Sequence, residues 1–173
     1  MTHFELFNLP ASVDLDVKAL EAKHRELSLA THPDRLVNAD ARERRIAAEK
    51  SAALNEAIKV LRDPVRRAFY VLELKGVKLD TEDAAAKVKM PMEFLEEIME
   101  HREALEGLRA KKNLDGAQKM AAEIRSAKEK SLAEAQAALR GDDVATATVS
   151  LGRVRYYTRF LDEVDAFEEE LLS

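Results

Sequence analysis

The sequence contains no cysteine, and this absence removes several classes of chemistry at once. Disulfides, thiolate nucleophiles and metal sites built on cysteine are excluded. The four histidines show no ligand spacing such as H-x-x-x-H, so a histidine-based metal site is not indicated either. We therefore expect the chain itself to bind no metal and no cofactor.

A surplus of basic residues is also missing. The 173 residues include 28 Lys and Arg against 33 Asp and Glu, whereas a general nucleic-acid binder needs a basic surface. No apolar run reaches membrane-spanning length, and the first residues, MTHFELFNLP, lack the basic leader and apolar run of a secretory signal. We expect a cytoplasmic protein, most simply a bacterial one, with no nucleic-acid or membrane partner.

Glycine (5) and proline (4) are scarce, and the abundance of Ala, Leu, Glu, Lys and Arg predicts an all-α fold. Capping carboxylates and prolines predict a helix that begins at residue 14 or 16 and ends at 31. A second begins at 38 or 40 and ends at Asp63, and a third begins at Pro64 and ends at Gly76. The first two should form a long antiparallel hairpin.

The second half is expected to hold a separate helical domain. Residues 77–89 are more polar and are interpreted as a linker. Three helices are then predicted, over about 91–111, 115–139 and 143–172. Because short connections place successive helices antiparallel, we expect a three-helix bundle over 90–173.

The tip of the predicted hairpin carries His32-Pro33-Asp34, and several interpretations are open. A small hydrolase using His32 and Asp34 would need a nucleophile and an oxyanion-hole motif, and the sequence offers neither. The tripeptide could simply end one helix. However, a polar tip stiffened by proline presents its side chains outward at low entropic cost, which suits docking onto another protein.

Three stretches around this tip resemble a known family. HFELFNL, KALEAKHRELSLATHPDR and LNEAIKVLRDPVRRAFY follow the order of elements of a J-domain, the module that activates DnaK-type chaperones. The resemblance implies that residues 1–76 form a J-domain whose His32, Pro33 and Asp34 contact the ATPase domain of such a chaperone. ATP hydrolysis then belongs to the partner, and the chain is not an enzyme. Candidates for the accompanying cationic docking face are Lys18, Lys23, His24, Arg25 and Arg35.

The predicted helix over 91–111 has an apolar strip wider than a core requires. At 100° per residue, its core stripe consists of Phe94, Ile98, Leu105 and Leu108. The apolar residues that extend this stripe round one flank are Met92, Leu95 and Met99. Charged residues beside the extension are Glu96, Arg102 and Glu103. An apolar strip with adaptable methionines and a charged rim is typical of a protein-binding surface.

The predicted last helix, over 143–172, has a similar pattern. Its core stripe is predicted to be Val154, Tyr157, Leu161, Val164 and Leu171. Large side chains off to one side are Tyr156, Phe160 and Phe167, which either pack on the rest of the chain or contact a partner. Because the first and last helices of such a bundle run parallel, we hypothesise that Leu95, Met99 and Phe160 share one exposed patch.

The stretches PMEFLEEIMEHREALE and RYYTRFLDEVDAFEEELL are similar to the C-terminal domain of HscB-type J-proteins, the co-chaperones of iron–sulfur cluster assembly. With the J-domain in front, the resemblance covers essentially the whole chain. It implies that the C-terminal domain binds the scaffold protein IscU and that the J-domain delivers it to the chaperone HscA. With Met92 added from the apolar strip, the scaffold-binding candidates are Met92, Leu95, Glu96, Met99, Arg102, Glu103 and Phe160. A J-protein with an unrelated client is the alternative.

Overall fold

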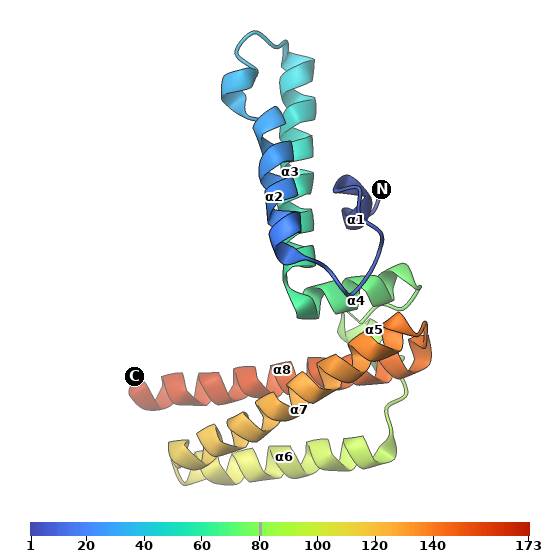
Figure 1. Cartoon of the computed structure of the whole chain (residues 1–173). Helices are drawn as coiled ribbons and strands as arrows, with labels where there is room; N and C mark the ends of the chain where they lie inside the picture. Colours follow the sequence, from blue (N-terminus) through green and yellow to red (C-terminus); the bar gives the residue numbers. More distant parts are fainter. Residues whose placement is uncertain (80) are drawn as a thin grey trace. The chain divides into compact units, whose positions relative to one another are not determined.

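The computed structural model describes residues 1–79 and 81–173, and every regular element in those residues is a helix (Figure 1). The chain divides into two compact units, residues 1–71 and 72–173. The predicted all-α fold, with a helical hairpin in the first half and a three-helix bundle in the second, is confirmed. The functional domain limits given above remain predictions.

The first unit is built around the hairpin. Its elements are α1 (His3–Leu6), α2 (Val17–Ala30), the short 3₁₀ turn η1 (Pro33–Arg35), α3 (Ala41–Arg62) and most of α4 (Pro64–Leu74). Helices α2 and α3 run antiparallel, and α1 packs against α3 (Figure 1). Side chains buried in this unit include Phe4, Leu20, Leu54 and Leu61. The connecting tip lies at the end of the hairpin remote from this core.

The helix starts are decided by side-chain caps. Two starting positions were predicted for each of α2 and α3. The structure selects Asp16 for α2, where Oδ1 accepts a hydrogen bond from the Ala19 amide at 3.1 Å, and Asp40 for α3. Asp40 forms a capping box, because it accepts from the Glu43 amide at 2.8 Å while the Glu43 carboxylate accepts from the Asp40 amide at 3.0 Å. The predicted stop at Asp63 is confirmed, since α4 begins at the next residue.

Arg67 is a buried charged side chain, only 7% exposed. Its Nε donates to the carbonyl oxygen of Val13 at 2.9 Å and its Nη1 donates to that of Leu61 at 2.6 Å. Burial lowers the pKa of the guanidinium, and the negative charges of Asp14 and Asp63 oppose that shift. The side chain therefore ties the segment before α2 to the C-terminal end of α3.

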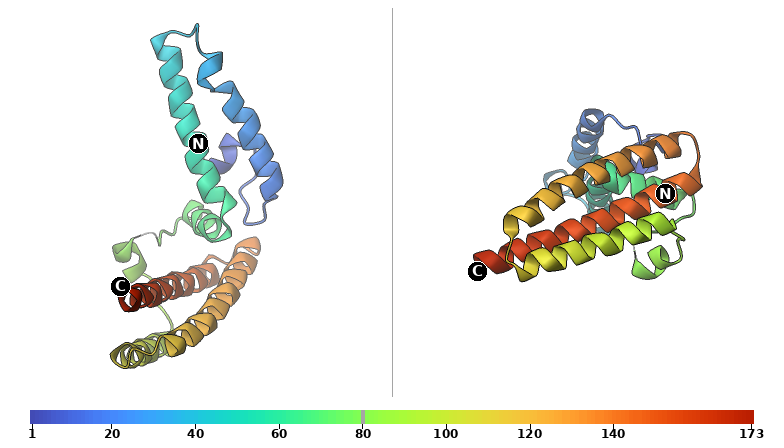
Figure 2. Two further views of the ribbon diagram at one scale, coloured as in Figure 1. Left: turned by 90° about the vertical axis from the view of Figure 1, so that its left-hand side faces the viewer. Right: turned by 90° about the horizontal axis from the view of Figure 1, so that it is seen from below.

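The second unit is a bundle of α6 (Met92–Ala110), α7 (Leu114–Arg140) and α8 (Val144–Leu172), preceded by the short α5 (Glu82–Ala86). Figure 2 shows the three long helices side by side in two views. Their bounds agree with the predicted ones to within about a residue. Helix α5 lies in the predicted linker and was not predicted, because five residues are too few to show a helical period.

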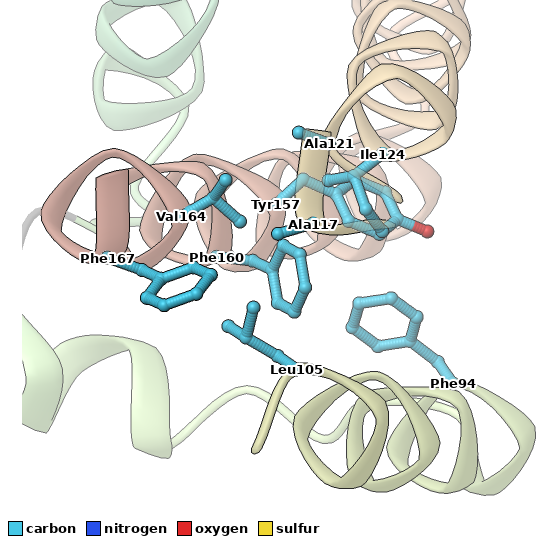
Figure 3. Packing of buried hydrophobic residues seen from close by; sticks show 9 residues of the cluster. All are labelled: Phe94, Leu105, Ala117, Ala121, Ile124, Tyr157, Phe160, Val164 and Phe167. Carbon is cyan, nitrogen blue, oxygen red and sulfur yellow. The ribbon is translucent and has the colours of Figure 1, made fainter. Parts of the chain in front are cut away.

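Unequal helix spacing characterises the bundle. Helices α7 and α8 approach closely along much of their length, and the small buried residues in these two helices include Ala117, Ala121, Ala135, Ala138, Ala147 and Ser150. Helix α6 is held by larger side chains. Figure 3 shows its Phe94 and Leu105 facing the aromatic rings of α8, and the Phe94 ring meets that of Tyr157 edge-on, with centroids 5.8 Å apart.

We expect the substitution Arg67→Ala to lower the free energy of unfolding of the first unit by about 2–4 kcal/mol, because two buried carbonyl groups lose their donors. Urea denaturation followed by circular dichroism measures the change, and amide exchange in α3 assigns it to this unit. The exposed neighbour provides a matched control, Arg66→Ala, which should shift stability by no more than about 0.5 kcal/mol. Equal stability of both variants would contradict the role given to Arg67.

Candidate functional site

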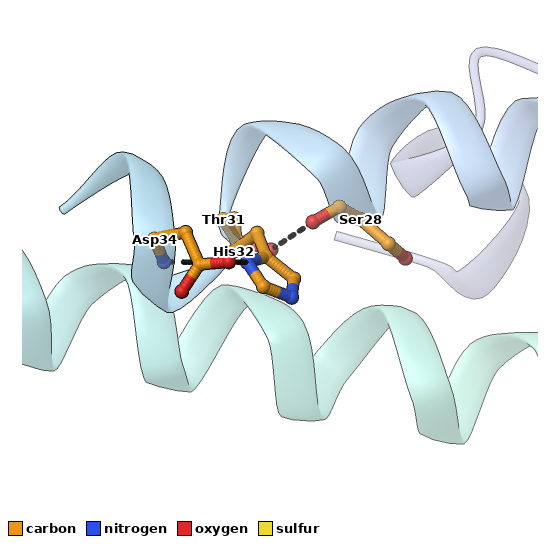
Figure 4. Close-up of polar contacts among 4 residues, drawn as sticks. All are labelled: Ser28, Thr31, His32 and Asp34. Atoms are coloured by element: carbon orange, nitrogen blue, oxygen red, sulfur yellow. Dashed lines mark hydrogen bonds and ion pairs between the residues drawn. The ribbon is translucent and has the colours of Figure 1, made fainter.

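The tripeptide His32-Pro33-Asp34 lies in the loop that joins α2 to α3 (Figure 4). His32 has an extended backbone and caps the η1 turn, and Pro33 is the first residue of that turn. The His32 side chain is 54% exposed and that of Asp34 is 90% exposed. The local fold therefore presents an imidazole and a carboxylate to solvent from a proline-stiffened turn.

The orientation of the His32 ring is fixed from within the turn. Its Nδ1 accepts a hydrogen bond from the Asp34 amide at 3.2 Å, and one oxygen of the Asp34 carboxylate lies 3.5 Å from the same nitrogen (Figure 4). Both contacts use Nδ1, so this nitrogen faces the turn. Nε2 is the ring nitrogen left to contact another molecule.

The predicted cationic face is only partly assembled. Lys18 and Arg25 are exposed seven residues apart, which places them on one face of α2. Lys23 lies on another side, with its Nζ 3.5 Å from the Glu26 carboxylate. Arg35 is exposed directly after the tripeptide. Lys18, Arg25 and Arg35 therefore remain the most accessible of the predicted cations.

His24, another predicted docking residue, instead uses its ring inside the hairpin. Its Nε2 lies 3.0 Å from the side-chain oxygen of Asn55 in α3 and 3.4 Å from the Ser28 hydroxyl. A catalytic relay would need the two partners on different ring nitrogens, whereas here both meet the same one. The group therefore joins α2 to α3 and does not form a hydrolytic triad.

A hollow of about 490 Å³ beside the tip was not foreseen from the sequence. Thr31, Pro33 and Leu36 line it from the loop, and α3 supplies the opposite wall. The lining residues of α3 are Arg44, Ala48, Ser51, Ala52 and Asn55. Their spacing of three and four residues marks one face of that helix, which is the signal that could have revealed them.

The exposed apolar strip on α6 is present. Met92 is 66% exposed, Leu95 42% and Met99 70%, so the predicted exposure of these three side chains is confirmed. The charged residues predicted beside them, all exposed, are Glu96, Arg102 and Glu103. Together these six residues are referred to below as the α6 strip.

The prediction that Phe160 belongs to this exposed patch is wrong. Phe160 is 2% exposed and lies in the core of the bundle, where its ring centroid is 5.7 Å from that of His101 of α6 (Figure 3). Phe167, also placed to one side by the wheel, is buried in the same cluster. The wheel assumed one buried stripe, whereas α8 packs against both α6 and α7 and therefore buries a wider face.

A cavity of about 440 Å³ lies beside the α6 strip, between α5, α6 and α8. Its apolar lining on α6 and α8 includes Phe94, Ile98 and Phe160. Polar lining residues on the same helices are Arg102, Arg155, Tyr156, Arg159 and Glu163. We call this feature the α6/α8 groove.

The groove was not predicted from the sequence, although a glycine in the last helix was a signal that could have pointed to it. Gly152 lies in the interior of α8, where glycine is unfavourable for helix formation. A Cβ atom built at this position would lie 2.8 Å from the thioether sulfur of Met90. The glycine thus leaves room for the end of the Met90 side chain against α8.

Two tyrosines connect α6 and α8 beside the groove. The Tyr156 hydroxyl donates to the Ile98 carbonyl at 3.2 Å, and the Tyr157 hydroxyl donates to the Glu97 carboxylate at 3.4 Å. Burial raises the pKa of the Tyr156 phenol, opposed by the nearby Arg102. Burial, with the negative charge of Glu97, raises the pKa of Tyr157 to about 12. Both phenols therefore stay neutral donors at physiological pH.

In the described part of the chain, no cluster of three or more His, Asp or Glu residues is arranged to hold a metal ion. None of the helices in that part is long and apolar enough to cross a membrane. The two candidate surfaces of the chain are the hairpin tip and the α6 strip with its groove.

Residues 90–165 match the family model described as the HSCB C-terminal oligomerisation domain. The co-chaperone protein HscB homolog of Burkholderia multivorans is 36% identical over 170 residues, which are 98% of this chain and 95% of that one. The homolog of Mannheimia succiniciproducens is 33% identical over 97% of this chain and 96% of its own. The chain belongs to the HscB co-chaperone family.

Solved structures of HscB proteins agree with this assignment. Chaperone HscB from Vibrio cholerae has a TM-score of 0.78 at 30% identity, with 99% of each chain covered. Human co-chaperone protein HscB has a TM-score of 0.83, with 97% of this chain and 82% of that one covered. At 22% identity the human structure supports the fold alone. As a member of the HscB family, the chain has a co-chaperone role.

In this HscB-family chain, the substitution Phe160→Ala should lower the free energy of unfolding of the second unit by about 3–5 kcal/mol, because it leaves a cavity in the aromatic core. Met99→Ala should change it by no more than about 0.5 kcal/mol, because that side chain is mostly in water already. Thermal and urea denaturation compare the two variants. If the Phe160→Ala variant has the same melting temperature as the unchanged protein, the ring does not lie in the core and the prediction of an exposed Phe160 holds.

Proposed function

We propose that the chain stimulates the ATPase of the DnaK-type chaperone HscA and delivers to it the scaffold protein IscU, for iron–sulfur cluster assembly or transfer. In this proposal residues 1–76 act as a J-domain, residues 90–173 bind the scaffold, and 77–89 connect them. The bacterial relatives favour the bacterial cytoplasm as the place of action. The observation that carries the proposal is the outward-facing His32-Pro33-Asp34 tip in a chain that matches HscB proteins along its length.

The chaperone side of the proposal follows from the chemistry of the tip. The turn holds the imidazole and the carboxylate 3.5 Å apart before any partner arrives, so docking loses little side-chain entropy. Lys18 and Arg25 add positive charge on the exposed face of α2. Such exposed cations increase the rate of association with an acidic surface and lose effect as salt screens them.

The scaffold side is supported by the composition of α6. Its exposed apolar side chains can enter pockets of a partner, and flexible methionines adapt to the shape of such pockets. The exposed charged residues beside these side chains are two glutamates and one arginine: Glu96, Glu103 and Arg102. A partner that combines an apolar centre with basic residues around it would therefore complement this face.

The proposal assigns no catalytic step to the chain, because His32 needs only to touch the chaperone. A J-protein with an unrelated client stays the alternative. Both hypotheses use the tip as the contact for the chaperone, so they differ only in which protein the α6 strip binds. A binding experiment with purified scaffold therefore separates them.

The substitution His32→Gln should abolish stimulation of the chaperone ATPase while leaving the fold intact, because the ring is 54% exposed and its hydrogen bond is to its own turn. ATP turnover by purified HscA is measured with increasing amounts of each variant, and circular dichroism reports helical content. The nearby exposed residue supplies the control Asn38→Ala, which should stimulate normally. Full stimulation by a folded His32→Gln variant would refute the docking role.

The double variant Leu95→Ala, Met99→Ala should bind the scaffold at least about tenfold more weakly, since an apolar anchor at the centre of an interface contributes about 1–4 kcal/mol. Titration calorimetry with purified IscU measures the affinity. Leu172→Ala is the matched control, because Leu172 is another exposed leucine that lies outside the α6 strip. Unchanged affinity of the double variant would exclude the strip as the scaffold site, and its chaperone stimulation without scaffold should persist in either case.

A further inference from the structure

The α6/α8 groove is covered by part of the chain itself. Residues 81–90, which we call the α5 cover, contribute Glu82, Ala85, Ala86 and Val88 to the lining of the cavity. The remaining walls come mainly from α6 and α8, and they include the apolar side chains of Phe94, Ile98 and Phe160. The cover therefore closes one side of a space whose other walls are largely apolar and arginine-rich.

The cover is attached near both ends and held weakly in its middle, and Leu79, close to its start, lines the cavity and is 3% exposed. At the end next to α6, the Met90 side chain packs at Gly152 of α8. In the middle, α5 has only five residues, and helices this short are not stable alone. Its alanines offer little apolar surface, and the contact that reaches across the groove is an ion pair in which Arg159 lies 2.7 Å from the Glu82 carboxylate.

This ion pair is easily broken. Its side chains are 53% exposed at Arg159 and 72% exposed at Glu82, and pairs in such contact with water contribute little to stability. The pair nevertheless places a carboxylate against one of the three arginines that line the groove, Arg102, Arg155 and Arg159. The α5 cover therefore shows which chemistry the groove accepts: small apolar groups over the cavity and an acidic group on Arg159.

The groove is continuous with the α6 strip. At 100° per residue, Ile98, Arg102, Leu95 and Met99 follow one another round α6, from the cavity to the exposed surface. Ile98 and Arg102 line the cavity, while Leu95 and Met99 are exposed. A protein that binds the strip consequently meets the edge of the groove next.

We propose that the α5 cover is a built-in competitor of the scaffold partner, which displaces it from the groove. An apolar side chain of the partner enters the cavity, and a partner carboxylate replaces that of Glu82 on Arg159. The inference rests on the proposed function, because it takes the scaffold as the protein that binds the α6 strip. It adds that binding is self-inhibited and that Arg159 serves first the cover and then the partner.

The test compares Glu82→Gln, Asp83→Asn and Arg159→Gln in the full chain by titration calorimetry with purified IscU. Glu82→Gln releases the cover and should tighten binding about two- to fivefold, the range that an exposed ion pair supplies. Asp83 also lines the cavity but is not the partner of Arg159, so Asp83→Asn should bind as the unchanged protein does. Arg159→Gln also releases the cover but removes the contact of the partner carboxylate, so it should bind more weakly than Glu82→Gln.

Unchanged or weaker binding by Glu82→Gln would overturn the proposal, and so would Arg159→Gln binding as tightly as Glu82→Gln. Amide exchange gives a second readout. The amides of Ala84, Ala85, Lys87 and Val88 are hydrogen-bonded within the cover and should exchange faster once scaffold is added. Slower exchange there would mean that the cover stays in place. No scaffold binding by the unchanged protein would instead refute the proposed function, which distinguishes the two failures.

Discussion

Close packing of α7 on α8 through small side chains sets the spacing of the second unit. Alanine and serine let the two helix backbones approach, and α6 cannot come as near because aromatic rings stand between it and α8. Phe94, Tyr157 and Phe160 fill that wider space. Where the filling stops, at the flank of α6, the groove and the exposed strip begin. The candidate binding surface is thus a consequence of how the core is built.

The first unit presents its candidate surface by a different physical means. A hairpin of two long helices concentrates its buried contacts between them, and Arg67 secures the end opposite the tip. The tip itself needs no buried side chain. Its order comes from the proline and from the hydrogen bond between the Asp34 amide and the His32 ring. Polar groups can therefore be exposed there at little cost to stability, whereas on α6 an exposed strip has to share a helix with the core.

Features encoded locally could be predicted from the sequence, and features that depend on distant neighbours could not. The caps at Asp16 and Asp40 act within three residues of themselves, so the sequence could narrow each helix start to two positions. The burial of Phe160 depends on two helices that meet on either side of it, which a wheel for one helix does not contain. The cavity could not be predicted for the same reason, because it lies between helices that are distant in the sequence. Helix α5 could not be predicted because it is too short to show helical periodicity. The residues of the tip and of the strip suggested contact with another protein, a resemblance supplied the named partners, and all of these roles remain predictions.

The contact between Gly152 and Met90 has an evolutionary consequence. A side chain at position 152 would meet the end of the flexible Met90 side chain, so a larger residue there requires that this side chain shift or that position 90 hold a shorter one. The two positions, far apart in the chain, are therefore expected to vary together among related proteins. Where the glycine is lost without such a change, the end of the Met90 side chain should leave its place on α8, and the segment before α6 should lose that contact.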